Sequence, residues 1–257
     1  METKLKEVLA VVNNKGGVGK TTTCVNLTAA LRRMGCKVLL VDFDPQGNAT
    51  SGMGISKRSS PNAYDVVIGG EDPRNAIITL PYGDVLPSNT DLSGAEVQLV
   101  GMEKREYRLR QALDPLRVRY DYIFIDCPPS LGLLPLNAFA AADSLLVPLQ
   151  CEYFAMEGVA DLTTTIKMCQ KRLNGALEIE GILLTMYDSR LNFSTQVSAE
   201  LRRYFGDKVY DSVIPRNVRL AEAPSHGRPI TEYDRHSKGA RAYIAAAEEF
   251  LKRQEGN

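Results

Sequence analysis

Short, continuously apolar runs alternate along the chain with longer segments of mixed apolar and polar residues. The runs at residues 38–41 and 123–125 contain no polar position, which is typical of strands buried on both faces of a sheet. The pattern predicts strands over residues 8–13, 37–43, 122–126, 144–148, 181–186 and 209–214. It predicts helices over residues 22–34, 93–118, 156–172, 193–204 and 238–253.

This alternation predicts an α/β fold, a doubly wound and mostly parallel sheet flanked by helices. The 257 residues, 44% hydrophobic and 24% charged, suit a single domain over residues 1–257. In such folds ligands bind at the carboxyl ends of the strands. The segment 47–61 is rich in Gly and Ser without a clear period, so we expect a mobile loop there.

Composition removes several classes of function. The formal net charge is zero, so no overall field attracts the chain to nucleic acid. The first residues lack the apolar core of a signal peptide, and no apolar run approaches the roughly 20 residues that span a bilayer. The five cysteines form no C-x-x-C pair, and there are two histidines. We therefore expect a cytoplasmic protein with free thiols and without a zinc site.

A glycine-rich segment follows the first predicted strand and precedes the first predicted helix. Its glycines let backbone N–H groups face an anion closely, and the helix N-terminus adds its own N–H groups. Lys20 can then reach the β- and γ-phosphates of ATP, and the Thr21 hydroxyl can bind Mg²⁺. The predicted nucleotide-binding residues here are Lys15, Gly16, Gly17, Val18, Gly19, Lys20, Thr21 and Thr22.

Carboxylates end two of the buried strands. Asp42 and Asp44 lie at the end of the second strand, and Asp126 ends the run at 123–125 in the manner of a Walker B motif. A carboxylate at this edge can hold Mg²⁺ or orient an attacking water. We predict Asp44 as a catalytic and metal-site residue and Asp126 as a metal-site residue. For Asp42, the sequence favours neither a structural role in a turn or helix cap nor a functional role over the other.

Two later strand ends carry further candidates. Glu152 follows the strand at 144–148, where it is either a rim carboxylate or a contact to a partner chain. Pro215 offers a flat apolar surface, and Asn217 offers both donors and an acceptor. These two residues suit the face and the edge of an adenine.

Four segments together resemble the ParA/Soj family of chromosome-partitioning ATPases, within the ParA/MinD class of P-loop proteins. They are KGGVGKTT at 15–22, VDFDPQGN at 41–48, IDCPP at 125–129 and IPRNVRLAEAPSHG at 214–227. The lysine at each end of the first segment is the deviant Walker A pattern. One departure is Asn13-Asn14, which should not disturb phosphate binding. The chain shows no helix-turn-helix extension like that of larger plasmid ParA proteins, so operator-specific repression is not expected.

The resemblance implies a cycle. ATP with Mg²⁺ would close a sandwich homodimer in which Lys15 reaches the partner's nucleotide, so that Lys15, Lys20 and Asp44 are the catalytic residues. The dimer would bind double-stranded DNA without sequence preference and associate with the nucleoid. A ParB/Spo0J-type centromere-binding protein would stimulate a weak ATPase, and the ADP form would leave DNA.

Residues 190–241 contain ten basic and six acidic residues. Such scatter is usually a solvated face, but the resemblance favours contact with DNA phosphates. The candidates are Arg190, Arg202, Arg203, Arg219, Arg228, Arg235, Lys238 and Arg241.

Two other functions remain open from the sequence. A MinD-like membrane ATPase would need a basic amphipathic helix at the C-terminus. The apolar stripe there, Tyr243, Ala246, Ala247, Phe250 and Leu251, is better explained as core packing, so no membrane is expected. The other alternative is a nucleotide-gated scaffold that positions cargo and hydrolyses ATP negligibly.

Overall fold

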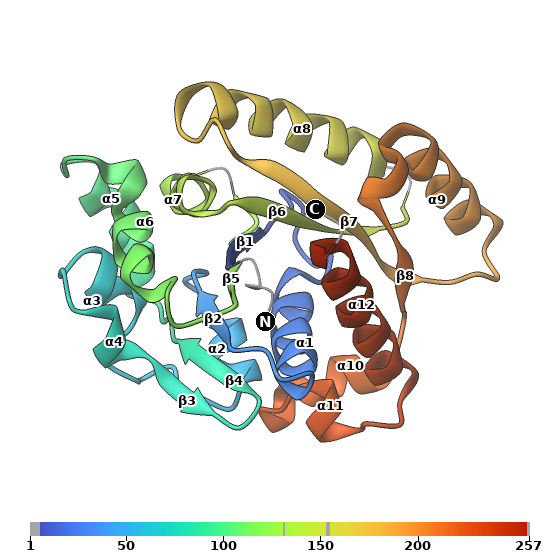
Figure 1. The fold of residues 1–257 in the computed structure, drawn as a ribbon, viewed down its shortest axis with the longest axis horizontal. Coiled ribbons are helices and arrows are strands. Elements are labelled where there is room, and N and C mark those ends of the chain that lie inside the picture. The colour runs from blue at the N-terminus through green and yellow to red at the C-terminus, as the bar shows by residue number, and fades with distance from the viewer. Residues whose placement is uncertain (1–5, 131, 153–154, 256–257) are drawn as a thin grey trace.

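The computed structural model describes residues 6–130, 132–152 and 155–255. They form one eight-stranded sheet with the strand order β3-β4-β2-β5-β1-β6-β7-β8, and every neighbouring pair is parallel except β3 and β4. Helices cover both faces of this sheet (Figure 1). The predicted doubly wound α/β fold is therefore confirmed.

The strands are β1 Glu7–Val11, β2 Val38–Asp42, β3 Ile78–Leu80, β4 Gly83–Leu86, β5 Tyr122–Asp126, β6 Ser144–Gln150, β7 Glu178–Tyr187 and β8 Val209–Pro215. The longer helices are α1 Lys20–Arg33, α5 Leu92–Leu99, α6 Arg108–Leu113, α7 Leu133–Ala141, α8 Ala155–Arg172, α9 Asn192–Phe205 and α12 Lys238–Glu255. The short helices are α2 Asn48–Gly52, α3 Ala63–Val67, α4 Pro73–Ala76, α10 Val218–Glu222 and α11 Ile230–Tyr233.

The central strand β1 shows why its sequence is apolar without a break. Val8 and Ala10 belong to the core on one face, beneath α5 to α9, whereas Leu9 and Val11 belong to the core on the other face, beneath α1 and α12. Successive side chains of a strand point to opposite faces, so a strand covered on both sides has no position for a polar residue.

The predicted helix over 93–118 is wrong, because the segment is broken into shorter pieces. After α5, Lys104 has a left-handed backbone with φ 51°, and short 3-10 turns at Arg105–Tyr107 and Asp114–Leu116 flank α6. Gly101 and Pro115 lie in these breaks, and both residues disfavour a continuous helix. The segment predicted as a loop over 47–61 contains α2, whose Ala49 and Thr50 are buried.

A buried carboxyl group lies near the amino end of β7. Glu180 is 9% exposed, and its Oε2 accepts a hydrogen bond of 2.7 Å from the Tyr210 hydroxyl. Burial raises the pKa of Glu180 from 4.5 to about 7, although the bond from Tyr210 acts in the opposite direction. Because the folded-state pKa is the higher one, this group favours folding most at acid pH, and the contribution is lost as the pH rises towards 7.

We predict that Glu180→Gln stabilises the protein more at pH 8 than at pH 5, by about 2 kcal/mol in the free energy of unfolding. The amide keeps an acceptor for Tyr210 but has no charge to bury. Urea unfolding at the two pH values measures the difference. Glu178→Gln, at an exposed position two residues earlier on the same strand, should show no such difference. An equal gain at both pH values would contradict the account.

Candidate nucleotide-binding site

The loop between β1 and α1 has the geometry of an anion cradle. Gly17 and Gly19 have left-handed backbones, with φ 76° and 91°. Residues other than glycine adopt this conformation only with strain. Gly19 immediately precedes α1, so the unpaired N–H groups of the first helical turn face the loop. A phosphate can therefore be held by backbone N–H groups alone, before any side chain contributes.

Two side chains outside the glycines fasten this loop to the sheet. The Asn13 amide donates to the Pro148 carbonyl at 2.9 Å, and its Oδ1 accepts a bond from the Lys15 backbone at 2.9 Å. The Thr185 hydroxyl, on β7, donates to the Val18 carbonyl at 2.8 Å. The sequence analysis did not assign this role to Asn13, although a polar residue at the end of an apolar strand could have indicated it.

The two lysines of the loop have different surroundings. Lys20 is 7% exposed, and its ammonium donates to the Lys15 carbonyl at 3.0 Å. Burial lowers the pKa of Lys20, whereas the charges of Asp126 and Asp44 oppose this shift. The Lys15 side chain is half exposed and forms an ion pair with Glu152 of the same chain. Lys20 is thus held inside the site, and Lys15 lies at its rim beside Glu152.

Asp42 and Asp126 lie opposite each other in the register of β2 and β5, and both are fully buried. Asp42 accepts bonds of 2.7 Å from both the backbone and the hydroxyl of Thr50, and burial raises its pKa to about 6. These bonds tie the end of β2 to α2. The sequence left a structural and a functional role for Asp42 equally open, and these bonds favour the structural role.

Asp126 has an incomplete set of partners. Its Oδ1 accepts a bond from the Cys24 thiol at 3.6 Å, but its Oδ2 is buried without a hydrogen-bond partner among the described residues. Burial and the nearby Asp42 raise the pKa of Asp126 well above its usual range, while the Thr21 hydroxyl acts in the opposite direction. A buried, unpartnered carboxylate oxygen fits a site that receives a cation.

Asp44 lies in the turn between β2 and α2 and is 7% exposed. Its Oδ1 accepts a bond from the Gln46 backbone at 2.9 Å, and its carbonyl accepts one from the Ser88 hydroxyl at 3.0 Å. In the part of the chain that the structure describes, no group of three or more His, Cys, Asp or Glu side chains could hold a metal. A Mg²⁺ ion would therefore depend on phosphate oxygens and water for most of its ligands.

A cavity of about 210 Å³ joins the phosphate loop to the end of β8. Gly19 and Thr22 line one side, and Pro215 and Asn217 line the other, so the structure brings the predicted adenine residues beside the loop. Asn217 Oδ1 already accepts a bond from the Leu220 backbone and caps α10. Met186 also lines the cavity; its left-handed backbone, φ 49°, gives no signal in the sequence.

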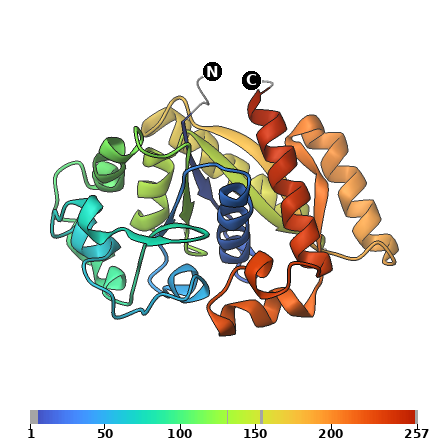
Figure 2. The same cartoon turned by 60° about the horizontal axis from the view of Figure 1, so that its bottom comes forward.

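The structure divides the basic candidates between two edges of the sheet. Arg190 follows β7, Arg219 lies on α10 after β8, and Lys238 begins α12, so all three lie towards the carboxyl edge, where α10 and α11 gather (Figure 2). Arg202 and Arg203 lie in the last turn of α9. Arg202 donates to the Tyr210 carbonyl and to Asp211 at the start of β8, which is the opposite edge.

The remaining basic candidates have exposed side chains. They are Arg228, Arg235 and Arg241. Arg190 pairs with Asp188, and Arg219 pairs with Glu222 and Asp234, so these two guanidinium groups already have carboxylate partners.

The apolar stripe of the last helix is packed inside the protein. Tyr243, Ala246, Ala247 and Phe250 are buried, and Phe250 lies against the Tyr122 and Phe124 rings of β5. The prediction of core packing is confirmed. Among the described residues, no helix combines the length and the apolar character that crossing a membrane requires.

Comparisons with known proteins found a matching family model and similar sequences. A family model described as an AAA domain matches residues 6–179. The sporulation initiation inhibitor protein Soj of Bacillus subtilis is 53% identical over 246 residues, covering 95% of this chain and 97% of the relative. The chromosome partitioning protein ParA of Myxococcus xanthus is 52% identical over 249 residues, covering 96% and 88%.

A solved structure shares the fold. It is that of cobyrinic acid a,c-diamide synthase from Mycobacterium smegmatis with bound ADP and magnesium, which is 40% identical, has a TM-score of 0.82 and covers 95% of this chain and 93% of that one. Its name denotes another reaction, and a shared fold does not by itself decide a function.

Fold and phosphate loop define a P-loop ATPase built on a doubly wound sheet. Within that class, this chain belongs to the ParA/Soj family of chromosome-partitioning ATPases. The predictions of an ATP hydrolase and of ATP with Mg²⁺ are confirmed at this level. The roles of single residues, the DNA surface and the partners stay predictions.

We predict that Lys20→Ala weakens ATP binding by about 10- to 100-fold, because it removes a buried charge-assisted contact to the phosphates. Thr21→Ala should weaken the dependence of binding on Mg²⁺. Titration with a fluorescent ATP analogue measures both, and Lys167→Ala, at an exposed position on α8, is the control. Unchanged affinity in Lys20→Ala would exclude the phosphate role.

Proposed function

We propose that this chain acts as a single-domain ATP-driven switch in chromosome or plasmid partitioning. Binding of ATP and Mg²⁺ closes a homodimer, the dimer binds double-stranded DNA without sequence preference, and a ParB/Spo0J-type partner stimulates hydrolysis and release. The observation that carries this proposal is that the two lysines of the loop differ in burial and in their contacts. Lys20 is buried and serves its own loop, whereas Lys15 lies at the rim.

Within one chain, the residues divide into those that hold phosphate and those that act on it. The loop N–H groups and Lys20 hold the β- and γ-phosphates. Thr21 and the unpartnered Oδ2 of Asp126 would hold the Mg²⁺ shell, which neutralises charge on the transferred phosphoryl group. Asp44, at the mouth of the turn before α2, orients the attacking water. A similar structure with bound ADP and magnesium supports this assignment of cofactors.

Lys15 is well placed to serve a second chain. Its ion pair with Glu152 joins two half-exposed side chains, and such pairs contribute at most about 1 kcal/mol. A phosphate arriving from a partner can therefore replace Glu152 at little cost. The adjacent Gly16 is exposed, and a Cβ there would meet only Pro129 Cβ at 4.0 Å within its own chain. The space beside Gly16 is thus available to another backbone.

The DNA surface that we propose lies at the carboxyl edge, around Arg190, Arg219, Arg228, Lys238 and Arg241. Dimerisation through the nucleotide face would place two copies of this edge next to each other, doubling the positive charge presented to the duplex. Contacts of this kind read phosphates and no bases, which fits non-specific binding. Arg202 and Arg203, at the other end of α9, are outside this surface.

Neither alternative is favoured by an observation in the structure. The membrane function would need an unpacked amphipathic helix, and the apolar face of α12 is already buried. The scaffold function predicts negligible turnover even with DNA and the partner present, and that turnover is the measurement that separates it from the proposed function.

The first prediction of this proposal concerns assembly. Lys15→Ala should bind one ATP per chain, because Lys20 remains, but should not form ATP-dependent dimers. Gly16→Val should behave in the same way, because it places bulk where two backbones meet. Light scattering with ATP and Mg²⁺ measures the dimer. Normal dimers and normal partner-stimulated turnover in Lys15→Ala would exclude the cross-dimer role.

The second prediction separates hydrolysis from DNA binding. Asp44→Ala should bind ATP, dimerise and stay on DNA, with turnover reduced at least about 100-fold, since its carboxylate acts on water and is not needed to hold phosphates. Filter binding over time, after dilution into competitor DNA, measures retention. Release as fast as that of wild type would contradict the role given to Asp44.

The third prediction places the DNA surface. The double variant Arg190→Gln with Arg219→Gln should lower DNA affinity equally for two unrelated duplexes and should reduce the salt slope by about two. Arg203→Gln removes a charge at the opposite edge and should leave the slope unchanged. An equal effect of both variants would show that the surface extends along α9, against the proposal.

A further inference from the structure

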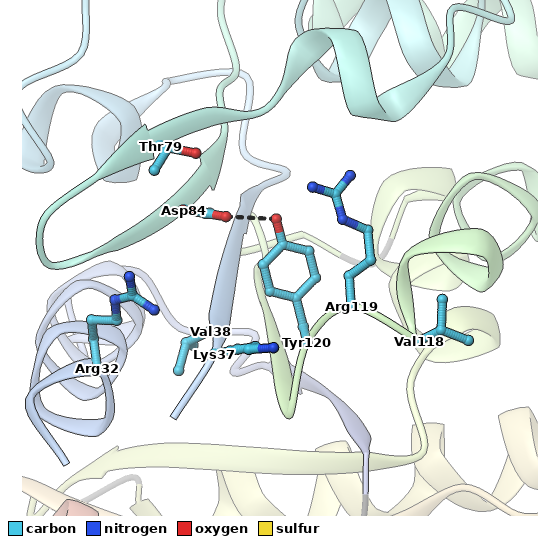
Figure 3. A pocket seen from close by; sticks show the side chains of 8 residues that line it. All are labelled: Arg32, Lys37, Val38, Thr79, Asp84, Val118, Arg119 and Tyr120. Carbon is cyan, nitrogen blue, oxygen red and sulfur yellow. Dashed lines mark hydrogen bonds between the residues drawn. The ribbon is translucent and has the colours of Figure 1, made fainter. Parts of the chain in front are cut away.

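A second cavity, of about 500 Å³, opens at the amino edge of the sheet, at the far end of the molecule from the phosphate loop. Its polar lining comes from the last turn of α1, the residue before β2, the β3–β4 hairpin and the segment before β5 (Figure 3). These polar residues are Arg32, Lys37, Thr79, Asp84, Arg119 and Tyr120.

Three of these side chains are cations that have no ion-pair or hydrogen-bond partner among the described residues. Arg32, Lys37 and Arg119 are exposed, and their side chains form no ion pair or hydrogen bond with any described residue. Neighbouring arginines behave differently, since Arg33 pairs with Glu232 and Arg117 pairs with Asp143. Figure 3 shows the three cationic side chains on different sides of Tyr120.

The acidic groups at this cavity are already engaged. Asp84 Oδ2 accepts a bond of 2.7 Å from the Tyr120 hydroxyl, and Asp121 Oδ2 accepts one of 2.7 Å from the Lys37 backbone. Burial and Asp84 raise the pKa of Tyr120, and Arg119 and Arg32 oppose that rise because they lie near the same hydroxyl. Arg32 and Arg119 therefore lie near one fixed, neutral hydroxyl, and Lys37 lines the same cavity.

We propose that this cavity binds a small molecule that carries two or more phosphate groups. Two guanidinium forks and one ammonium match phosphate oxygens, and the Thr79 hydroxyl adds another donor. The volume lies within the range of small-molecule sites. A concave site favours such a ligand over duplex DNA, whose phosphates follow an extended and convex backbone.

The site is separate from the ATP site. Arg32 lies twelve residues after Lys20 on α1, which corresponds to about 18 Å along a helix. A ligand here would therefore touch the ends of α1 and β2 opposite to those that carry Lys20 and Asp42. The ligand would bind whether or not nucleotide is present.

Calorimetric titration with inorganic pyrophosphate tests the proposal, using the Lys20→Ala variant without added nucleotide or Mg²⁺, because ADP itself carries two phosphate groups and would occupy the same cavity. We expect one pyrophosphate per chain. Adding Arg32→Gln and Arg119→Gln should weaken this binding at least about ten-fold, because two charge-assisted contacts are lost. The control removes two exposed charges on α8, Lys167→Gln with Lys171→Gln, and should change affinity less than about two-fold.

Thermal unfolding of each variant verifies that it is folded before its affinity is compared. Absence of pyrophosphate binding, or equal weakening in the two double variants, would overturn the proposal. A further arm measures duplex DNA binding by the Arg32→Gln, Arg119→Gln chain with Lys20 intact. Loss of DNA affinity without any pyrophosphate site would assign these cations to DNA and would also overturn it.

Discussion

The charged residues buried at the carboxyl edge are the constraint on which the rest of the structure depends. Lys20, Asp42, Asp44 and Asp126 are each less than 10% exposed. Burying charges is costly unless each is paired or hydrogen-bonded. Asp42 is satisfied by Thr50, which ties β2 to α2, and Lys20 by the carbonyl of its own loop. Among the described residues, Asp126 retains one oxygen without a hydrogen-bond partner, and this is the oxygen that we propose for the Mg²⁺ shell.

The same arrangement fits the proposed control of assembly by the nucleotide site. On the inner side of the loop, Lys20 already has a hydrogen-bond partner within the same chain. On the outer side, Gly16 is exposed and Lys15 is held only by a surface ion pair. A ligand can favour one assembly state only through contacts that differ between the states. In the proposed dimer Lys15 would offer such a contact, because its ion pair with Glu152 within one chain is a weak one.

Much of this could be predicted from the sequence where burial imposes a pattern. The strands that end at Asp42 and Asp126 are apolar throughout because helices cover both their faces. The helix α7 was missed for the same reason: its sequence, LLPLNAFAA, is nearly all apolar and has no amphipathic period. Asp42 could not be assigned, because its partner Thr50 lies in a Gly- and Ser-rich segment that has no helical signature. Charge counts along the chain could not tell which arginines share an edge, and so Arg202 and Arg219 were grouped although they lie apart.

The central claim is that ATP, and not ADP, joins two chains through the nucleotide face. Light scattering coupled to size exclusion tests it directly on the wild-type protein, with Mg²⁺ and either ADP, ATP or a slowly hydrolysed ATP analogue. The account predicts the mass of one chain, 28.3 kDa, with ADP and twice that mass with ATP or the analogue. The same mass in all three nucleotides, at every protein concentration, would contradict it.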